Sequence, residues 1–394
     1  MKYEPLSKLY YKEKNNYETI YKERIASGIK TGIGINGYPS FYMQEIEAYK
    51  KIVNIQRIND RIIESCKSLP PAALDQYADK CLIEEIVVTN EIEGVHSTKR
   101  EIEDVLEDLG AKDKRKRFLG LVNKYRMLNR RASIRLETSK DVRALYDELV
   151  AAEVAEQDTE NLPDGRLFRK RSVEVVSPAQ ESIHSGLMPE NTIIETMDKA
   201  LMFLNSGDED IIIRTAVFHY LFGYIHPFYD GNGRLSRFIS SYMLTKVLHP
   251  LVGYTLSFVI KDNIRGYYKA FKECNDKHSR GDMTPFIVFF VDVVEKACLQ
   301  LEEDLTQKVA ELSYYRDRID QVCDDDKMRT LYDILLQGTL FSITGIPTEG
   351  LLQILEISRP TLNKRLSMIR GRGLLEEELI EKRKYYRIRI DKLS

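Results

Sequence analysis

The sequence predicts a mainly α-helical protein with a small β-hairpin near its middle and a winged helix at its C-terminal end. Three observations lead to this fold class. Apolar residues recur at three- and four-residue spacing along most of the chain, which is typical of helices. Residues 171–186 alternate instead, as paired strands do. From residue 327 the pattern changes to three short helices followed by alternating residues around a KRK turn, which is the order of elements in a winged helix.

The composition limits the classes of protein that fit. The chain has 394 residues, enough for two or three domains, and a formal net charge of −2, which argues against a global field that attracts nucleic acid or membranes. Five widely spaced cysteines without a CxxC pair argue against a disulfide framework or a zinc site. The first residues lack the apolar core of a signal peptide, and no apolar run is long enough to span a membrane. We therefore expect a cytoplasmic protein with no membrane partner.

The N-terminal part of the chain is predicted to consist of helices. Residues 41–66 form one periodic segment, which Pro70 and Pro71 end. Residues 73–92 form a second one, and Gly94 suits the end of that helix.

A third helix is predicted from a capping box. Thr98 and Glu101 have the T-x-x-E spacing of this motif, and the helix runs to Gly110. The basic run KDKRKR at 112–117 is interpreted as a solvated helix face, with nucleic-acid binding as the alternative.

The middle of the chain combines the hairpin with two buried helices. The segment 209–225 is apolar nearly all round, so it belongs in the centre of a bundle. Pro227 ends it, and a further helix is predicted from about 233 to 248. Residues 226–237 therefore form a helix–loop–helix junction.

The domain division predicted from these elements has three parts. Residues 1–110 form an N-terminal helical region that includes the helix at about 73–94. Residues 111–322 form the core domain, and residues 327–394 form the winged helix.

One glycine pattern is rejected as a nucleotide site. Gly32 to Gly37 reads GIGING and satisfies G-x-G-x-x-G, but a dinucleotide fingerprint needs a preceding strand and a following helix. We predict a flexible loop there. His219, on the buried helix, is predicted to be a hydrogen-bonded core residue.

The junction HPFYDGNGRLSR, residues 226–237, has the groups needed to bind a phosphate chain. Residues 231–233 precede a helix, where glycines allow close approach and free N–H groups bind anions. Arg234 and Arg237 lie three apart on one helix face, so both can reach the same phosphates.

Two further residues of the junction suit group transfer to a hydroxyl. His226 can act as a general base near neutral pH. Asp230 can hold Mg²⁺, which binds through one carboxylate together with phosphate oxygens. Calcium binding by an EF-hand loop is excluded, because Phe228 and Ile239 occupy positions where that loop needs acids. A helix cap with a structural histidine is the remaining alternative.

The junction resembles the signature of Fic-domain proteins, H-P-F-x-D/E-G-N-G-R-x-x-R, without departure. The resemblance covers roughly residues 75–300 and implies a Fic helical bundle. It also implies transfer of AMP from ATP, with Mg²⁺, to a Ser, Thr or Tyr hydroxyl of a target protein or of the chain itself. The hairpin at 171–186 would be the flap that aligns the target peptide by strand pairing; an ordinary surface hairpin is the alternative. We also expect a homodimer.

The resemblance assigns roles to the residues of the junction. His226 would deprotonate the hydroxyl, Phe228 would anchor the loop in the core, and Asp230 would bind Mg²⁺. The implied phosphate contacts are Gly231, Asn232, Gly233, Arg234 and Arg237.

The segment YYKAFKECN resembles the part of the family that contacts the nucleoside. Tyr268 and Asn275 are its candidate contacts. The alternative is that the tyrosine pair only packs, as tyrosines at helical spacing often do.

The segment TNEIEG resembles the inhibitory motif S/T-x-x-x-E-G/N of class II Fic proteins, with Thr89, Glu93 and Gly94 in the defining places. A carboxylate that reaches Arg237 would form a bidentate pair and place negative charge where the γ-phosphate must lie. ATP bound beside it would have a misaligned α-phosphate. The alternatives are that Glu93 is an ordinary acid at a helix end, or that it supports removal of AMP.

The C-terminal domain suggests a second class of function. Residues 327–394 are locally basic, and DNA binding is one interpretation of a winged helix at this place. The alternatives are that it docks a protein or that it packs on the core domain. The recognition helix would begin with Arg359, Thr361, Asn363, Lys364 and Arg365, and Lys382, Arg383 and Lys384 would form the wing tip. The alternative function is therefore a DNA-binding regulator with a nucleotide-sensing core. A Fic enzyme that transfers UMP or phosphate, or that removes AMP, is a third.

Overall fold

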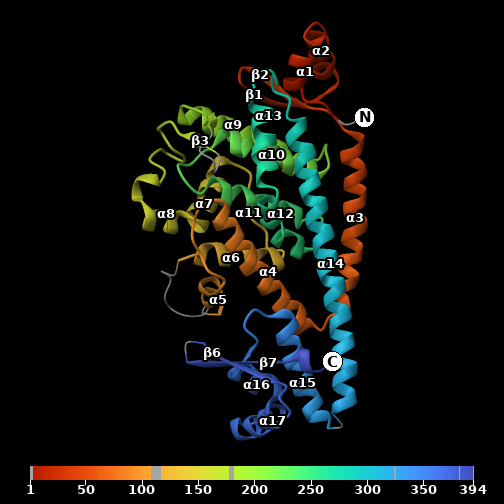
Figure 1. The fold of residues 1–394 in the computed structure, drawn as a ribbon. Coiled ribbons are helices and arrows are strands. Elements are labelled where there is room, and N and C mark those ends of the chain that lie inside the picture. Colours follow the sequence, from red (N-terminus) through yellow and green to blue (C-terminus); the bar gives the residue numbers. More distant parts are fainter. Residues whose placement is uncertain (1–2, 108–116, 177–181, 324, 381, 394) are drawn as a thin grey trace. The chain divides into compact units, whose positions relative to one another are not determined.

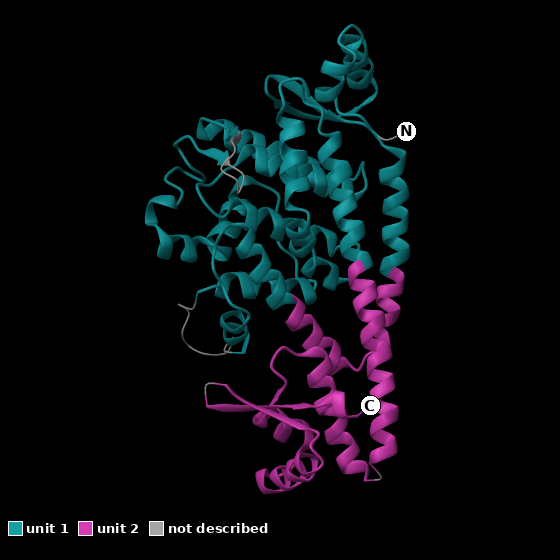
Figure 2. Ribbon diagram, viewed as in Figure 1, with its two compact units in different colours: residues 1–59, 82–299 teal, residues 60–81, 300–394 magenta. Residues whose placement is uncertain are grey.

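The structure is a computed structural model that describes residues 3–107, 117–176, 182–323, 325–380 and 382–393. It divides into two compact units, which Figure 2 shows in different colours. The first unit comprises residues 1–59 and 82–299, and the second comprises residues 60–81 and 300–394. The helices α3 (Ile46–Lys67), α4 (Pro71–Ile92) and α14 (Thr284–Val322) each contribute residues to both units. The predicted division at residues 110 and 322 stays a prediction.

The chain begins with two short helices and a β-hairpin. These are α1 (Leu6–Lys12), α2 (Tyr17–Ser27), and the antiparallel strands β1 (Ile29–Ile35) and β2 (Tyr38–Tyr42). The prediction of a flexible loop at Gly32 to Gly37 was therefore wrong. Asn36 and Gly37 form the turn with φ values of 50° and 82°, and Asn-Gly is the pair that a tight hairpin turn requires.

The next helix begins later than the sequence predicted. Phe41 and Tyr42 belong to β2, and α3 begins at Ile46. Both aromatic side chains are buried, so their spacing fits a strand packed on the core as well as it fits a helix.

The helix α4 ends with the hydrogen bonds of a Schellman motif. Gly94 has a φ of 72°, its N–H donates to the carbonyl of Glu91 at 3.1 Å, and Val95 N–H donates to the carbonyl of Asn90 at 2.9 Å. This conformation is the reason that a glycine suits position 94.

The predicted capping box is present at the start of α5 (Lys99–Glu107). The hydroxyl of Thr98 accepts from Glu101 N–H at 3.1 Å, and the Thr98 N–H points back to the Glu101 carboxylate at 3.5 Å. The predicted end of this helix at Gly110 and most of the basic run 112–117 lie outside the described residues.

The centre of the first unit is α10 (Ile211–Ile225), which packs against α9 (Glu190–Asn205) and α11 (Asn232–Leu244) (Figure 1). Most of α10 is buried, as its apolar sequence predicted. His219 is buried and bonds through both ring nitrogens, to Ser240 and to Tyr267, at 2.8 Å each. The prediction that His219 is a hydrogen-bonded core residue is confirmed.

The predicted hairpin at 171–186 is present as β3 (Glu174–Val176) and β4 (Ser182–Ser185). The strands are antiparallel, with Val175 opposite His184. Residues 177–181 lie outside the described part of the chain.

The remaining helices of the first unit surround this centre. They are α6 (Leu119–Asn129), α7 (Ser139–Leu149), α8 (Ala151–Gln157), α12 (Leu256–Asp262) and α13 (Ile264–Asn275), with short 3₁₀ turns at Thr159–Asn161 and Pro250–Tyr254.

The C-terminal part of the second unit follows the predicted order of elements. Its helices are α15 (Asp326–Phe341), α16 (Thr348–Leu355) and α17 (Arg359–Gly371). Its strands are β5 (Ile346–Pro347), β6 (Leu375–Ile380) and β7 (Arg383–Ile388), which form a sheet of order β5-β7-β6, and the 3₁₀ turn Ile390–Lys392 follows.

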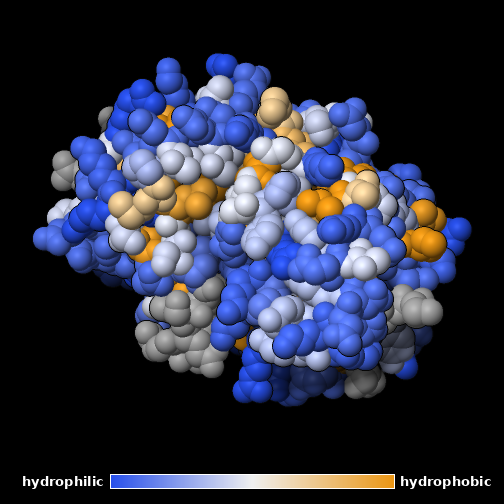
Figure 3. Space-filling view, turned by 90° about the horizontal axis from the view of Figure 1, so that it is seen from above, coloured by the Kyte–Doolittle hydropathy of each residue, from blue (hydrophilic) through white to orange (hydrophobic). Residues whose placement is uncertain are grey.

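The surface is largely polar and the cysteines are internal. The face seen in Figure 3 is mostly hydrophilic, with small scattered groups of hydrophobic residues. Among the described helices, none has the length and apolar character needed to cross a membrane. All five cysteines are buried, and none of them forms a disulfide.

Candidate active site

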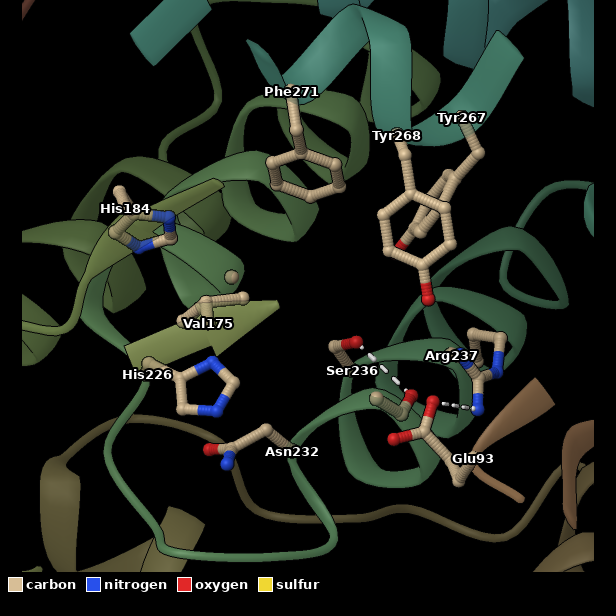
Figure 4. Close-up of a pocket in the computed structure, with 12 residues that line it drawn as sticks. Glu93, Val175, His184, His226, Asn232, Ser236, Arg237, Tyr267, Tyr268 and Phe271 are labelled. Atoms are coloured by element: carbon tan, nitrogen blue, oxygen red, sulfur yellow. Dashed lines mark hydrogen bonds and ion pairs between the residues drawn. The ribbon is translucent and has the colours of Figure 1, made fainter. Parts of the chain in front are cut away.

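The loop after α10 begins with a residue in an unusual conformation. His226 has a φ of 49°, and its N–H still donates to the carbonyl of Phe222 at 2.9 Å. Pro227 cannot continue the helix, so the chain turns here. The turn places the imidazole of His226 at the cavity shown in Figure 4.

The imidazole of His226 is held in its neutral form. Burial lowers the pKa of His226 to about 3, and His184 and Arg169 contribute by repulsion. A hydrogen bond to the backbone of Gly223 acts in the opposite direction. The neutral ring therefore keeps a lone pair on the nitrogen that does not donate to Gly223, as a general base requires.

The loop from Phe228 to Asn232 is closed by its own side chains. The Asn232 amide donates to the carbonyl of Phe228 at 2.8 Å and accepts from its N–H at 3.0 Å. The ring of Phe228 is buried and stacks on Tyr146 with centroids 3.8 Å apart. Gly231 takes the left-handed conformation with a φ of 82°, whereas Asn232 is already the first residue of α11.

The first turn of α11 supplies anion-binding groups. The first bond within this helix runs from Leu235 N–H to the carbonyl of Gly231 at 3.0 Å. The N–H groups of Asn232, Gly233 and Arg234 therefore have no partner within the helix, and the helix dipole is positive at this end.

The cavity beside this turn has a volume of about 120 Å³. In Figure 4, His226 and Asn232 lie on one side, Glu93 and Arg237 on another, and the aromatic residues of α13 across from them. The lining residues are Glu93, Val175, His184, Gly223, His226, Asn232, Gly233, Ser236, Arg237, Tyr267, Tyr268 and Phe271.

Arg237 is the buried cation of this cavity, with 1% of its side chain exposed. Its Nη2 donates to Glu93 Oε1 at 2.8 Å and to the carbonyl of Thr89 at 3.0 Å, and its Nε donates to Thr89 Oγ1 at 2.8 Å. The pairing with Glu93 thus uses one carboxylate oxygen and is not the expected bidentate pair, because Thr89 accepts from Nε and shares Nη2 with Glu93.

The carboxylate of Glu93 lies directly against the first turn of α11. A Cβ added at Gly233 would overlap Oε1 of Glu93 and would lie 2.6 Å from its Cδ. Glu93 thus occupies the space that an anion bound at this helix end would use, with 22% of its side chain exposed.

The geometry of α4 explains why Thr89 and Glu93 act on the same arginine. They are four residues apart, so they share one helix face. Gly94 ends the helix directly after Glu93 in the Schellman motif described above. The structure therefore brings together Thr89, Glu93 and Arg237, which the sequence had linked only by resemblance.

Arg234 and Asp230 lie apart from this cavity's lining. The Arg234 side chain is 0% exposed, and it donates to Glu153 at 2.7 Å and to Asp230 Oδ1 at 3.3 Å. Both of the guanidinium contacts are to carboxylates, so Arg234 is held by α8 and by the loop. The assignment of Arg234 to the phosphates stays a prediction.

The two candidate nucleoside contacts fall in different places. Tyr268 lines the cavity. Asn275 does not line it; its side chain accepts from the Tyr220 hydroxyl at 2.7 Å and donates to Nδ1 of His184 at 3.3 Å.

The sequence did not mark several of the lining residues as part of a site. Val175 and His184 come from the hairpin, and Tyr267 and Phe271 from α13. Only the alternation around His184 and the helical spacing of the aromatic residues were visible, and both patterns also describe ordinary packing.

Asp230 is the candidate metal ligand. Its side chain is 29% exposed, and its Oδ1 accepts from Arg234 and from Gly231 N–H. The described residues contain no cluster of three or more metal-binding side chains. A single accessible carboxylate next to a phosphate-binding turn fits Mg²⁺, which takes most of its ligands from water and phosphate.

Comparison with known proteins gives matches to one family. Residues 137–244 match the model described as Fic/DOC family. Over 97 residues the chain is 35% identical to proteins named protein adenylyltransferase Fic from Drosophila yakuba and from Drosophila melanogaster. Each alignment covers 24% of this chain and 18% of the relative, so the matched segment spans less than a fifth of these curated relatives.

A solved structure shares the fold over most of the chain. It is a Fic family protein from Desulfovibrio desulfuricans G20, with a TM-score of 0.54 and 21% sequence identity. The match covers 88% of this chain and 97% of that chain.

Proposed function

The chain is a Fic-domain protein, and from this premise we propose that it is a self-inhibited protein adenylyltransferase. It transfers AMP from ATP to a Ser, Thr or Tyr hydroxyl of a target protein or of itself. The observation that carries this proposal is the place of Glu93: its carboxylate lies against Gly233 at the anion-binding turn and pairs with Arg237.

The residues of the loop support the transfer step. His226 accepts the proton of the target hydroxyl at its free ring nitrogen while the hydroxyl oxygen attacks the α-phosphorus. The bond from this phosphorus to the β-phosphate oxygen breaks, and pyrophosphate leaves. The N–H groups of the first turn of α11 hold the phosphates, and Tyr268 contacts the nucleoside.

Mg²⁺ would be held by Asp230 together with phosphate oxygens, and it would neutralise charge that develops on the leaving pyrophosphate. The hairpin β3–β4 contributes Val175 to the cavity wall. Its strand edge is suited to pair with an extended target segment beside His226.

Inhibition follows from competition for one anion position. With Glu93 in place, Arg237 is already paired, and a second negative charge at the same turn is repelled. ATP that binds under these conditions has its α-phosphate displaced from the in-line position, which lowers the rate on the order of a hundredfold or more.

The first prediction tests this mechanism with labelled ATP. We expect Glu93→Gly to raise AMP incorporation into the protein or a target by on the order of a hundredfold. In this background His226→Ala is expected to lower incorporation by about 10²- to 10⁴-fold, because the general base is lost. Incorporation is measured by electrophoresis and by the mass of the modified peptide.

The controls separate inhibition from general damage to α4. Glu91→Gly places a glycine in the same helix end, and we expect it to leave incorporation at the wild-type level, because Glu91 is exposed and pairs with Lys261. Parallel reactions with labelled GTP, CTP and UTP test the nucleotide. Equal labelling by wild type and Glu93→Gly would contradict the inhibition, and preferred use of UTP would show another Fic transferase.

The C-terminal elements favour a second candidate function. We propose that residues 327–394 form a winged helix that binds DNA, because Arg359, Thr361, Asn363 and Lys364 are exposed on the first turns of α17. Lys382, Arg383 and Lys384 are exposed at the turn between β6 and β7.

A further inference from the structure

Arg169 is a buried arginine whose guanidinium donates only to backbone carbonyls in the described contacts. The residue is 0% exposed and lies in the segment between the 3₁₀ turn Thr159–Asn161 and β3. Its Nε donates to the carbonyl of His226 at 2.8 Å, its Nη1 to that of Arg171 at 2.7 Å, and its Nη2 to that of Leu187 at 2.9 Å.

The three carbonyls belong to the parts of the site that must be aligned. His226 is the proposed general base, and Arg171 and Leu187 lie on either side of the strands β3 and β4. The backbone N–H of Arg169 also donates to the carbonyl of Pro227 at 3.2 Å. One planar side chain with a fixed fork of donors thus connects the catalytic loop to both ends of the hairpin.

The burial of this guanidinium carries a free-energy cost. Burial lowers the pKa of the Arg169 guanidinium, because removal of a charge from water is costly when no carboxylate compensates it. Carbonyl dipoles offset part of this cost. The arginine is distinguished from a neutral side chain of similar size by its three donors, which bond carbonyls of three separate segments.

The packing around Arg169 leaves little freedom for the loop. A Cβ added at Gly186 would overlap Nη2 of Arg169 and would lie 3.1 Å from Cβ of His226. Leu187 N–H donates to the carbonyl of Ile225 at 3.1 Å, so the end of the hairpin also contacts the end of α10.

We propose that Arg169 is a positioning residue, which sets the distance and orientation of the His226 imidazole relative to the hairpin that presents the target hydroxyl. This inference rests on the proposed function. Arg169 itself is absent from the lining of the nucleotide cavity, so it acts through the carbonyl of His226 and the two ends of the hairpin.

The charges around His226 agree with this role. Arg169 and His184 face it from the segment before β3 and from β4, and Glu93 and Arg237 lie across the same cavity from α4 and α11. Arg169 adds to the repulsion that keeps the imidazole neutral, and its fixed position therefore helps to keep His226 in the form that accepts a proton.

The second prediction uses Arg169→Met, Arg169→Lys and the control Lys170→Met, each in the Glu93→Gly background. Lys170 is the exposed neighbouring cation. We expect Arg169→Met to lower kcat on the order of a hundredfold, because a displacement of about an ångström has such an effect. The KM for ATP and the Kd of a fluorescent ATP analogue should change less than about threefold, since Arg169 does not touch the cavity. Arg169→Lys should recover part of kcat, because an ammonium can reach one or two of the three carbonyls.

A second measurement does not depend on activity. Hydrogen exchange by mass spectrometry is expected to be faster in Arg169→Met at both 182–188 and 222–230, and unchanged in Lys170→Met. If no variant transfers AMP while both segments exchange faster, the proposed function fails and the connection by Arg169 stands. Unchanged kcat in folded Arg169→Met, or an equal loss of ATP affinity and kcat, would overturn the positioning role.

Discussion

At the scale of single residues, Glu85 stands out as a buried carboxyl near the ion pair of Glu93 and Arg237. It lies on α4 two turns before Glu93 and accepts from the Ser257 N–H at 3.0 Å and from the Ser257 hydroxyl. The Tyr125 hydroxyl also donates to it at 3.4 Å. Burial raises the pKa of Glu85 to about 7, although Ser257 and the nearby Arg237 act in the opposite direction.

The third prediction concerns the pH dependence that this residue gives to stability. The folded state binds the Glu85 proton more tightly than the unfolded state, whose pKa is near 4.5. The contribution of Glu85 to stability is therefore fully present below about pH 4.5, and it is lost as the pH rises from there to about 7. Between pH 5 and pH 8, we expect the free energy of unfolding to fall by up to about 3 kcal/mol more in wild type than in Glu85→Gln.

The measurement is urea denaturation of wild type, Glu85→Gln and the control Glu91→Gln at both pH values. The control removes an exposed carboxylate from the same helix. The assignment to Glu85 would be refuted if the difference between pH 5 and pH 8 were the same in all three proteins.

His226 shows how far residue-scale reasoning from the sequence reaches. Its candidate role as a base was inferred from its chemistry and its place in the motif. The cause of its lowered pKa did not, because burial and the neighbours Arg169 and His184 depend on segments 42 to 57 residues away in the chain. Sequence spacing within one loop carries no information about such neighbours.

At the scale of elements, the end of α4 and the start of α11 are held together by the hydrogen bonds of Arg237 to Thr89 and Glu93. The Schellman end of α4 presents Glu93, and the first turn of α11 presents Gly233 without a side chain. The glycine gives the carboxylate room to approach the helix end. Under the proposed mechanism a phosphate needs the same space, so the mechanism predicts that Glu93 and a phosphate exclude each other at this turn.

The fourth prediction tests this contact between elements. In wild type, Gly233→Ala is expected to destabilise the protein by about 1–3 kcal/mol, because the added Cβ displaces Glu93 from Arg237. In Glu93→Gly the obstacle is gone, and alanine in a helix is expected to be neutral or to stabilise by up to about 1 kcal/mol. The free energy of unfolding is measured for the four proteins of this cycle.

Gly207→Ala is the control for this cycle, because an added Cβ there meets no atom within 4 Å. Its effect should be the same with and without Glu93. If Gly233→Ala has additive effects in the two backgrounds, the carboxylate does not lie against this turn in solution.

Elements with a strong local signal were predictable from the sequence. The buried helix α10, the capping box before α5 and the hairpin β3–β4 were predicted because their patterns depend on neighbours a few residues apart. The hairpin at Asn36 and Gly37 was missed although its turn signal was present. Asn36 and Gly37 lie at the end of the G-x-G-x-x-G pattern, and the whole pattern was interpreted as a flexible loop.

At the scale of the whole molecule, the residues behind the two proposed functions fall in separate units. The first unit contains the cavity, and the second contains the three helices and the sheet that we interpret as a winged helix. On α17, Arg359 pairs with Glu349, while Lys364 is exposed. The exposed strand β6 adds Glu376, Glu377 and Glu378, so the basic surface is local.

The fifth prediction is salt-sensitive binding of duplex DNA by the full chain. A mobility shift with random duplex DNA is expected at micromolar protein in low salt and to weaken as salt rises. Lys364→Ala should reduce the slope of log K against log salt by about one, since one phosphate contact is lost. Lys327→Ala, an exposed lysine of α15, is the control and should leave the slope unchanged. No shift at any salt concentration would remove DNA binding as a function of this unit.

The sequence by itself determined which chemical groups this protein brings to its candidate site. The motif HPFYDGNGRLSR contains a candidate base, a candidate metal ligand, a glycine turn at a helix start and two arginines, all within twelve residues. The resemblance to Fic-domain proteins came from the same residues, and a Fic/DOC family model matches residues 137–244. The helical fold class came from local periodicity and is confirmed.

Only the tertiary structure decided which of these groups meet. Glu93 and Arg237 are 144 residues apart in the chain, and their contact exists because α4 packs its last turn against α11. Arg169 reaches His226 across 57 residues, and the structure leaves Arg234 with Glu153 instead of in the cavity. Residue types fix what each group can do, whereas packing between distant segments fixes which partner it has.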